Sequence, residues 1–410
     1  MTLKGARDAD LRKEEDIYPK EITFNPILRA KENSNGKKAS SVLLTILKNL
    51  KIGTELTGMS SPILLDRGLS TLELNADGRK PTESLFKFFE ESDPLLRALH
   101  FTRHLLVNFV GFVSLRLERT KPFNPILGEQ FFTYWEDPTD DEAKFECILE
   151  QVSHHPPVTA YYIRNKKWNY ENYGCHRSSV VFKGNSIELK NVGPSIVAHT
   201  NPSTLVREEY TVDGITAEGV GIIFGAAAFG LTSKSIIECK QTGAHVELKF
   251  SKQHHVKGKI KLPDPNNPKK MIKHYRFSGD LLKVIELEDM ATKKKTPWVE
   301  LSKLNYFHKI MRKVADQEDL ESRKVWHNVR YGILKDDDTL ASEQKHIIEE
   351  HQRDLRKQRE KDSTIFTPKY FTETDQSDVK KYPDFRINSE GLKKIDSYFA
   401  TLEVDDDDLD

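Results

Sequence analysis

Between Gln130 and about Leu287, short apolar runs alternate with clusters of Gly, Asn and Asp, a pattern typical of strands joined by turns. Residues 159–163, 179–182 and 246–250 are examples, rich in β-branched or aromatic side chains. Helical periodicity does not alternate with these runs, so the pattern predicts an antiparallel sheet, either a barrel or a sandwich. Long strands with apolar inward positions can enclose a ligand cavity.

Two stretches before the strands have helical periodicity. Residues Ser40–Lys51 precede Gly53 and carry apolar side chains at i, i+3, i+4 and i+7, namely Leu43, Ile46, Leu47 and Leu50. This segment is either an ordinary core-packing helix or a lid that covers an apolar cavity or touches a membrane. Residues 81–113 have apolar stripes that predict helices, and Asp93-Pro94 divides them into two.

After Pro297 the pattern predicts helices again. Residues 342–360 are dense in charge, and within them Lys345, Glu349 and Arg353 stand at i, i+4 and i+8, on one stripe of a helix. Such a stripe is common in surface salt-bridge ladders, and this is its ordinary interpretation. Seven lysines between 252 and 273 face one acid, Asp264, and indicate either a solvated loop or a weak patch for anionic membranes.

Composition narrows the class of protein. Of the 410 residues, 37% are hydrophobic and 31% charged, and the formal net charge is zero, which argues against general nucleic-acid binding. The three cysteines, Cys147, Cys175 and Cys239, form no disulfide framework or zinc spacing, so a reducing cytosol is expected. The start of the chain has no signal-peptide pattern. The longest uncharged run, 219–231, is too short to span a bilayer, so membrane contact is expected to be peripheral.

The strongest candidate site is the stretch Glu150-Gln151-Val152-Ser153-His154-His155-Pro156-Pro157. The two prolines have fixed φ and no N–H, so strand pairing is expected to stop there, with His154 and His155 presented at the strand end. Imidazoles can be held protonated by a nearby dianion, which suits phosphate recognition. A surface accident is the ordinary interpretation of a His-His pair, and His254-His255, which lacks the Pro-Pro stop, is taken as one.

A second stretch, Lys121-Pro122-Phe123-Asn124-Pro125-Ile126-Leu127-Gly128-Glu129, cannot form a regular helix because of its prolines and glycine. It predicts a stiff, extended turn that fixes the directions of Lys121 and Asn124. A lysine supplies a mobile charge for a phosphate, and an asparagine amide can bind a hydroxyl group. A proline-braced loop with a solvated lysine is the alternative.

Together these motifs resemble the oxysterol-binding-protein-related (OSBP/Osh) lipid transfer proteins, over about residues 40–372. The resemblance is carried by 121–125, 150–157, 321–326 and 345–353, the last followed by Pro368 and Phe371. It implies an α+β, mainly antiparallel fold, a nearly closed β barrel around an apolar lipid tunnel, with an N-terminal lid and a C-terminal helical layer. The implied organisation is a mobile polar tail (1–38), a lid (39–75), a helical segment (76–120), the β-barrel core (121–290), the helical layer (291–372) and an extension with an acidic tail (373–410).

The resemblance also implies roles for single residues in binding phosphatidylinositol 4-phosphate. His154 and His155 would hold the 4-phosphate, and Arg353 would complete its cage. Lys121 and Asn124 would bind the glycerol-side phosphate and the inositol, and Lys345 and Glu349 the inositol ring. Leu56, in the lid, would lie over the bound lipid. The chain would be a short form with only the lipid-binding domain, because 38 leading residues cannot hold the accessory domains of longer members.

The expected function is a cytosolic lipid transfer protein that exchanges phosphatidylinositol 4-phosphate for a sterol, peripherally on organelle membranes with an anionic surface. The alternatives are exchange for phosphatidylserine and a phosphoinositide sensor without net transport. The segment Ser60-Ser61-Pro62 slightly favours the sterol carriers.

A hydrolase using His154, His155 and Glu150 is disfavoured, because no hydrolase motif or phosphate loop is present. No catalytic residue, metal, nucleic acid or cofactor other than the bound lipid is expected. Two departures from the family pattern are the glycine-rich 219–231 and Gly279-Asp280, where a glycine followed by tryptophan is expected.

Overall fold

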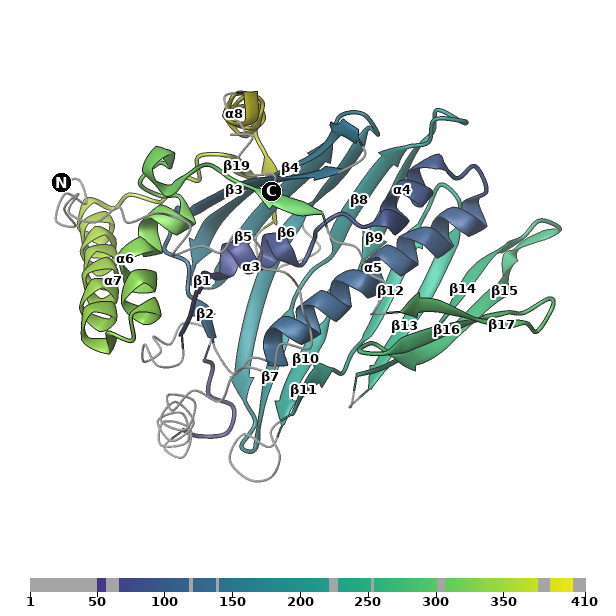
Figure 1. Ribbon diagram of the computed structural model, residues 1–410, viewed down its shortest axis with the longest axis horizontal. Coiled ribbons are helices and arrows are strands. Elements are labelled where there is room, and N and C mark those ends of the chain that lie inside the picture. The colour runs from purple at the N-terminus through teal and green to yellow at the C-terminus, as the bar shows by residue number, and fades with distance from the viewer. Residues whose placement is uncertain are drawn as a thin grey trace.

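The computed structural model describes residues 50–56, 66–117, 121–137, 140–220, 228–251, 254–300, 307–374 and 384–400. The expected polar tail 1–38, most of the predicted helix Ser40–Lys51 and the acidic run Asp405–Asp408 lie outside these residues. The described chain is organised around one large antiparallel sheet with helices on both of its faces (Figure 1).

Sixteen of the described strands form this sheet, in the order β17-β16-β15-β14-β13-β12-β9-β8-β6-β5-β4-β3-β18, with β7, β10 and β11 branching beside β6. The strands are β3 (Gln130–Asp137), β4 (Asp140–His154), β5 (Pro157–Asn165), β6 (Tyr170–Phe182), β7 (Ser186–Asn191), β8 (Ser195–Thr200), β9 (Arg207–Val212), β10 (Thr216–Val220), β11 (Ala228–Leu231), β12 (Lys234–Cys239), β13 (Ala244–Ser251), β14 (His255–Asp264), β15 (Asn267–Asp280), β16 (Val284–Asp289), β17 (Lys295–Glu300) and β18 (His308–Ile310). The predicted antiparallel sheet is confirmed.

The sheet curls toward closure. Its two end strands, β17 and β18, are not hydrogen-bonded to each other within the described ranges. They are nevertheless consecutive in the chain, with Glu300 and His308 eight residues apart. Eight residues span at most about 29 Å, so the two ends of a sheet this wide must approach each other. This is the geometry of the expected nearly closed barrel.

Three of the described helices precede the large sheet: α3 (Thr71–Asp77), α4 (Glu83–Glu90) and α5 (Pro94–Leu117). The predicted division at Asp93-Pro94 is confirmed, because the Asp93 carboxylate accepts the backbone N–H of Leu95 and Leu96 at 2.8 and 3.0 Å and caps α5. The helices pack on the inner face of the sheet, in a core that includes Phe88, Phe101, Val110, Val246, Ile260 and Phe277. Helix α3 begins inside the expected lid range 39–75, but Leu72 and Ala76 are fully buried in this core.

The expectation of helices from 291 onward is wrong for residues 295–300 and 308–310, which form β17 and β18. Pro297 suggests the end of the sheet, but it lies on an end strand beside a register irregularity, where the missing N–H is tolerated. The helical layer begins later, with α6 (Ser322–Leu334) and α7 (Asp338–Asp362) after the short 3₁₀ helix Val314–Asp316. The Asp337 side chain caps α7 by accepting the Leu340 N–H at 2.9 Å.

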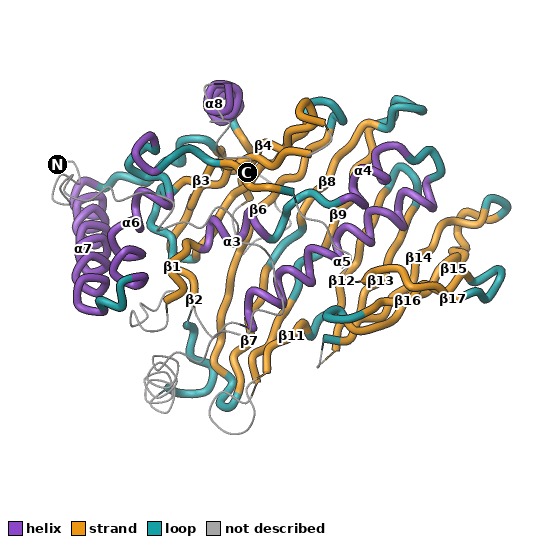
Figure 2. Tube along the Cα trace, in the orientation of Figure 1, coloured by secondary structure: helices purple, strands orange, loops and turns teal. Residues whose placement is uncertain are grey.

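Part of the expected C-terminal extension belongs to the fold. Strands β19 (Phe371–Thr374) and β20 (Asp384–Ile387) form a hairpin, and α8 (Ser389–Ala400) follows. They cover the outer face of β3–β6, opposite α3 and α4 (Figure 2). Side chains alternate between the two faces of β4, so this strand contributes to both hydrophobic cores. Leu149 lies in the core on the inner face and Ile148 in the core on the outer face. A small parallel pair, β1 (Asp66–Ser70) and β2 (Lys121–Phe123), precedes β3.

Candidate functional site

The His-His-Pro-Pro stretch forms the tight turn between two long strands. Strand β4 ends at His154 and β5 begins at Pro157, so pairing stops where the prolines predict. The His155–Pro156 peptide is cis, and the Ser153 hydroxyl donates to the Pro156 carbonyl at 2.7 Å. The two imidazole rings lie 4.7 Å apart between centroids. Because His155 lies in the turn and not in a strand, its ring is not sent to the opposite face of the sheet from that of His154.

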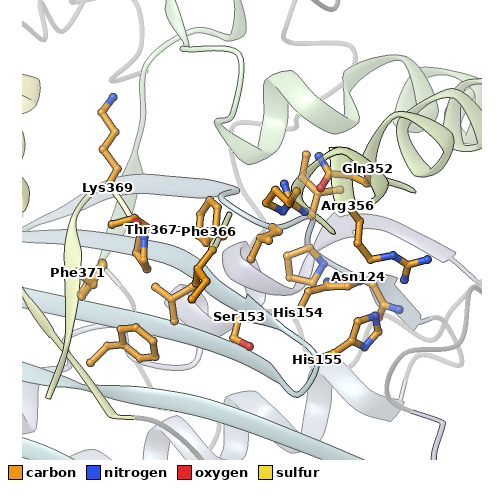
Figure 3. Close-up of a pocket in the computed structure, with 18 of the residues that line it drawn as sticks. Asn124, Ser153, His154, His155, Gln352, Arg356, Phe366, Thr367, Lys369 and Phe371 are labelled. Atoms are coloured by element: carbon orange, nitrogen blue, oxygen red, sulfur yellow. The ribbon is translucent and has the colours of Figure 1, made fainter. Parts of the chain in front are cut away.

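The turn opens into a cleft of about 970 Å³. Six of the seven predicted head-group residues line it: Asn124, His154, His155, Lys345, Glu349 and Arg353. They come from the turn after β2, the β4–β5 turn and helix α7, and Figure 3 shows Asn124, His154 and His155 together at one end. Lys121, the seventh, opens β2 three residues before Asn124 and is not among the lining residues.

The charged stripe on α7 faces this cleft. Lys345 is only 8% exposed, although lysine is rarely buried without a functional or structural reason. Glu349 lies one turn further and pairs with Arg353, with 3.4 Å between Oε2 and Nη2. Arg353 also contacts the Glu350 carboxylate. The Glu349–Arg353 pair agrees with the salt-bridge interpretation of the stripe, and the stripe also lines the cleft.

His154 is neutral at physiological pH in this state. Burial, followed by electrostatic interaction with His155 and Arg356, lowers the pKa of His154 to about 4; a hydrogen bond to the Pro125 backbone acts in the opposite direction. Its Nδ1 is buried and has no partner in the described part of the chain. The expectation of a protonated ring therefore applies only when an anion is bound, because a nearby dianion is needed to restore the charge.

A buried glutamate organises the Asn124 turn. Glu129, 0% exposed, accepts hydrogen bonds from Ser322 Oγ at 2.7 Å, Trp326 Nε1 at 3.0 Å and the Ile126 N–H at 3.0 Å, and contacts the Ser70 hydroxyl. Burial raises the pKa of Glu129. This one side chain ties the turn before β3 to the segment before α3 and to α6, so it fixes the position of the turn rather than contacting a ligand.

A second buried glutamate holds the opposite wall. Glu150, 1% exposed, accepts the backbone N–H groups of Lys369 and Tyr370 at 2.7 and 2.8 Å. These residues end the segment 363–370, which we call the strap and which joins α7 to β19. Phe366 of the strap lies over Gly128, whose φ of +83° would strain any other residue and where an added Cβ would come within 3.3 Å of the Phe366 ring. Each Glu150 oxygen thus accepts a backbone N–H of the strap, which gives this carboxylate a structural role.

Several lining residues were missed by sequence reasoning. Arg356 and Arg359 extend the α7 stripe at i+3 and i+6 from Arg353, and that spacing was available in the sequence. Other missed residues come from the strap, β19 and the β20–α8 segment, and no local pattern in the sequence places them near the histidines. They include Ile365, Phe366, Thr367, Lys369, Thr372, Glu373, Phe385, Asn388 and Glu390. Pro368 and Phe371, which the resemblance included, also line the cleft.

Leu56 lies on the inner side of the sheet. Its N–H donates to the Val180 carbonyl at 2.7 Å, and Glu55 pairs with Val181 in an antiparallel bridge. This register puts Leu56 in one cross-strand row with Val180, Leu189 and Ala217. Ala217 belongs to the inner core, so Leu56 faces the same side. The backbone of residues 53–56 therefore adds to the β6 edge of the wall.

The lysine-rich region is a hairpin of long strands rather than a solvated loop. All of its described lysines lie in β14 or β15. Lys259 pairs with Glu247 at 2.9 Å, and Lys261 contacts the same carboxylate. At the departure Gly279-Asp280, Asp280 stands in place of the expected tryptophan and ends β15. Gly279 agrees with the expected pattern, and a Cβ there would come within 2.2 Å of the Val284 carbonyl oxygen. The backbone approach there excludes any larger residue.

The fold is a large curled sheet, and the cleft at the β4–β5 turn is lined by histidines and by basic side chains of α7. The chain belongs to the oxysterol-binding protein family, which matches residues 42–335. Protein kes1 of Schizosaccharomyces pombe is 30% identical over 82% of this chain and 88% of its own length. Oxysterol-binding protein 4 of Dictyostelium discoideum is 29% identical over 86% and 76%, and oxysterol-binding protein homolog 6 of Saccharomyces cerevisiae 28% over 89% and 82%.

Solved structures share the fold. The Osh1 ORD domain in complex with ergosterol superposes with a TM-score of 0.72 at 21% identity, over 89% of this chain and 90% of that one. The Osh3 ORD of Saccharomyces cerevisiae in complex with PI(4)P gives 0.63 at 19%, over 88% and 94%. The barrel-like architecture predicted for the chain is therefore confirmed. No helix among the described residues is long and apolar enough to cross a membrane.

Proposed function

We propose that this protein transfers lipids between membranes, binding phosphatidylinositol 4-phosphate in the cleft and exchanging it for a sterol. The observation that carries the proposal is the convergence of Asn124, the two histidines and the α7 stripe on one cleft. More than 220 positions separate Asn124 from Lys345 in the chain. The group combines cations for phosphates with an amide and a carboxylate for ring hydroxyls, which is the chemistry of an inositol phosphate.

Each residue has a proposed role in this site. His154, His155 and Arg353 hold the 4-phosphate, with Arg353 supplying the planar fork that suits a phosphate. Lys345 and Glu349 bind the inositol ring, and Lys121 and Asn124 bind the glycerol-side phosphate and the inositol. Lys121 lies outside the cleft lining, so its side chain has to swing toward the ligand on binding.

The lipid tails lie on the inner side of the sheet, where Leu56 stands in the apolar row of β6, β7 and β10. Burial of apolar surface is worth about 25 cal/mol per Å², so an enclosed tail can offset much of its removal from a bilayer. A sterol uses the same apolar interior without the head-group residues. The solved complexes of the Osh1 ORD with ergosterol and of the Osh3 ORD with PI(4)P support both ligands.

The protein carries lipid and catalyses no reaction on it in this proposal. Glu150, the one carboxylate within the histidine motif, has both oxygens bound to backbone N–H groups of the strap. Transfer takes place at the cytoplasmic surfaces of organelle membranes, where the protein binds anionic lipid transiently. Exchange for phosphatidylserine, and retention of a phosphoinositide without transport, are the outcomes that a lipid assay has to separate from sterol exchange.

A variant with both His154 and His155 replaced by alanine tests the site. It is expected to lose extraction of phosphatidylinositol 4-phosphate from liposomes and to keep extraction of a fluorescent sterol. The matched control replaces His254 and His255, the other adjacent pair, and is expected to keep both activities. Equal loss of both ligands in a folded His154→Ala/His155→Ala variant would show that the cleft is not a head-group site.

A further inference from the structure

The basic end of the cleft has more cationic groups than the head-group assignments use. Arg359 is half-buried and lines the cleft, yet its guanidinium has no hydrogen bond or ion pair with the residues described. Arg356 lines the same cleft as His155 and Asn124 (Figure 3), and within the described residues its ion pair is with Glu360, at a long 3.8 Å. Its charge also reaches His154 and lowers the pKa of that ring. This surplus attracts an anionic partner beyond the protein's own paired carboxylates.

Residues 403–410 have the matching charge. Their sequence, Glu-Val-Asp-Asp-Asp-Asp-Leu-Asp, holds six acidic side chains and no basic one. Blocks of like charge often serve as interaction segments. The segment follows α8, the helix whose beginning forms part of the cleft wall through Asn388 and Glu390.

The distance from α8 to the cleft is within reach of this segment. Lys369, which lines the cleft, and Lys394 of α8 both contact the Glu318 carboxylate. From Lys394 the helix rises about 9 Å to Ala400, its last residue. The ten residues that follow can extend to at most about 36 Å. This length exceeds the rise of the helix from Lys394, and Lys369, Arg356 and Arg359 line the same cleft.

We propose that the acidic segment 403–410 docks on Arg356 and Arg359 and competes with anionic ligands for the cleft. The partner surface is the anion site of the proposed function, so the inference rests on that site and adds an internal competitor to it. Exposed ion pairs are individually weak, but a tethered segment acts at a high effective concentration. The expected effect is therefore modest, about 3- to 10-fold in ligand affinity, and sensitive to salt.

Competition inside the cleft is distinguishable from simple repulsion between the acidic segment and an anionic membrane. A soluble ligand, inositol 1,4-bisphosphate, has no membrane to repel. Calorimetry of the full chain would compare the parent with a variant in which Asp405, Asp406, Asp407 and Asp408 are replaced by Asn. We expect the Asn variant to bind about 3- to 10-fold more tightly at low salt and equally at about 0.5 M NaCl.

Two further variants make the comparison specific. Replacement of the same four residues by Glu keeps the charge and is expected to behave as the parent. Removing the docking cations, with Arg356→Gln and Arg359→Gln, is expected to abolish the difference between the Asp and Asn forms. Equal affinity of the parent and the Asn variant at low salt would overturn the proposal, and a change seen only with anionic vesicles would also overturn it in favour of repulsion.

A peptide-binding experiment separates this inference from the proposed function. A synthetic peptide of residues 401–410 is titrated into the Asn variant and followed by fluorescence anisotropy. Saturable binding that the Arg356→Gln/Arg359→Gln variant lacks would support docking even if inositol 1,4-bisphosphate fails to bind. Absence of peptide binding to a variant that does bind inositol 1,4-bisphosphate would reject docking and leave the lipid site intact.

Discussion

The carboxylate of Glu150 accepts the backbone N–H of Tyr370 at 2.8 Å, across 220 positions of sequence. Its other oxygen accepts the neighbouring Lys369 N–H at 2.7 Å. The first residue of the histidine motif thus fixes the strap that forms the facing wall of the cleft. The residues of this motif therefore have two different roles. Glu150 positions the strap, and His154 and His155 line the cleft that the strap bounds.

Glu150→Gln is therefore expected to loosen the strap. A glutamine has one acceptor oxygen, so one of the two backbone N–H groups, of which that of Tyr370 is buried, loses its partner, at a cost of about 1–3 kcal/mol in the free energy of unfolding. Urea denaturation measures the change. The control Glu83→Gln removes an exposed glutamate paired with Lys87 and is expected to stay within about 0.5 kcal/mol. Unchanged stability of Glu150→Gln would contradict the bracing role.

Binding of a phosphate dianion is expected to take up a proton at His154. The pKa of His154 is lowered to about 4 without ligand, and a dianion raises it by favouring the charged ring. Affinity therefore rises as pH falls from about 8 toward 6.5, by up to about tenfold per unit. Calorimetry of inositol 1,4-bisphosphate in buffers of different ionisation enthalpy measures the uptake.

His154→Gln is expected to remove most of this uptake, and His254→Gln to preserve it. If the parent protein takes up no proton between pH 6.5 and 8, His154 does not bind the phosphate in its charged form. The same lowered pKa has a consequence for stability without ligand. Protonation of His154 favours the unfolded chain, so this contribution to stability is present above about pH 6.5 and is lost as pH falls through about 4.

Arg353→Lys is expected to weaken inositol 1,4-bisphosphate binding by about tenfold or more. Lysine keeps the charge but loses the planar pair of donors that a phosphate accepts. Lys357→Gln, on an exposed part of the same helix where Lys357 pairs with Asp354, is the control and is expected to change affinity little. Equal affinity of Arg353→Lys and the parent would indicate that Arg353 serves only its pairing with Glu349 and Glu350.

Leu56→Asp is expected to impair sterol uptake and to spare inositol 1,4-bisphosphate binding. The substitution places a charge in the apolar row that includes Val180 and Leu189, and an unpaired charge is strongly disfavoured there. Ile52→Asp is the matched control, because Ile52 is 75% exposed in the same segment. Titration of a fluorescent sterol measures uptake. Normal uptake by Leu56→Asp would place the tail site elsewhere.

Local patterns predicted much of this architecture. Period-2 alternation marked the strands, Asp93-Pro94 divided α4 from α5, and the two prolines after His155 ended the pairing of β4. The stripe of Lys345, Glu349 and Arg353 followed from helical spacing. These features depend on the few residues around them, so the sequence is sufficient to predict them.

The rest depends on contacts between distant segments. Strand β17 was missed because Pro297 is tolerated only by virtue of its place at the end of the sheet. The strap and α8 join the cleft through Glu150, Glu318 and the outer core, none of which has a local signature. The buried Glu129 was seen only as the end of a proline-rich turn, although its partners lie on α6 and before α3.

The most direct test of the central claim is native mass spectrometry of the protein after incubation with liposomes of defined composition. With sterol-containing liposomes we expect one bound sterol, and on adding phosphatidylinositol 4-phosphate we expect that lipid to replace it one for one. Bound phosphatidylserine in place of sterol would keep the exchange mechanism and change the second lipid. Simultaneous binding of both lipids, or binding of neither, would contradict exchange at a shared site.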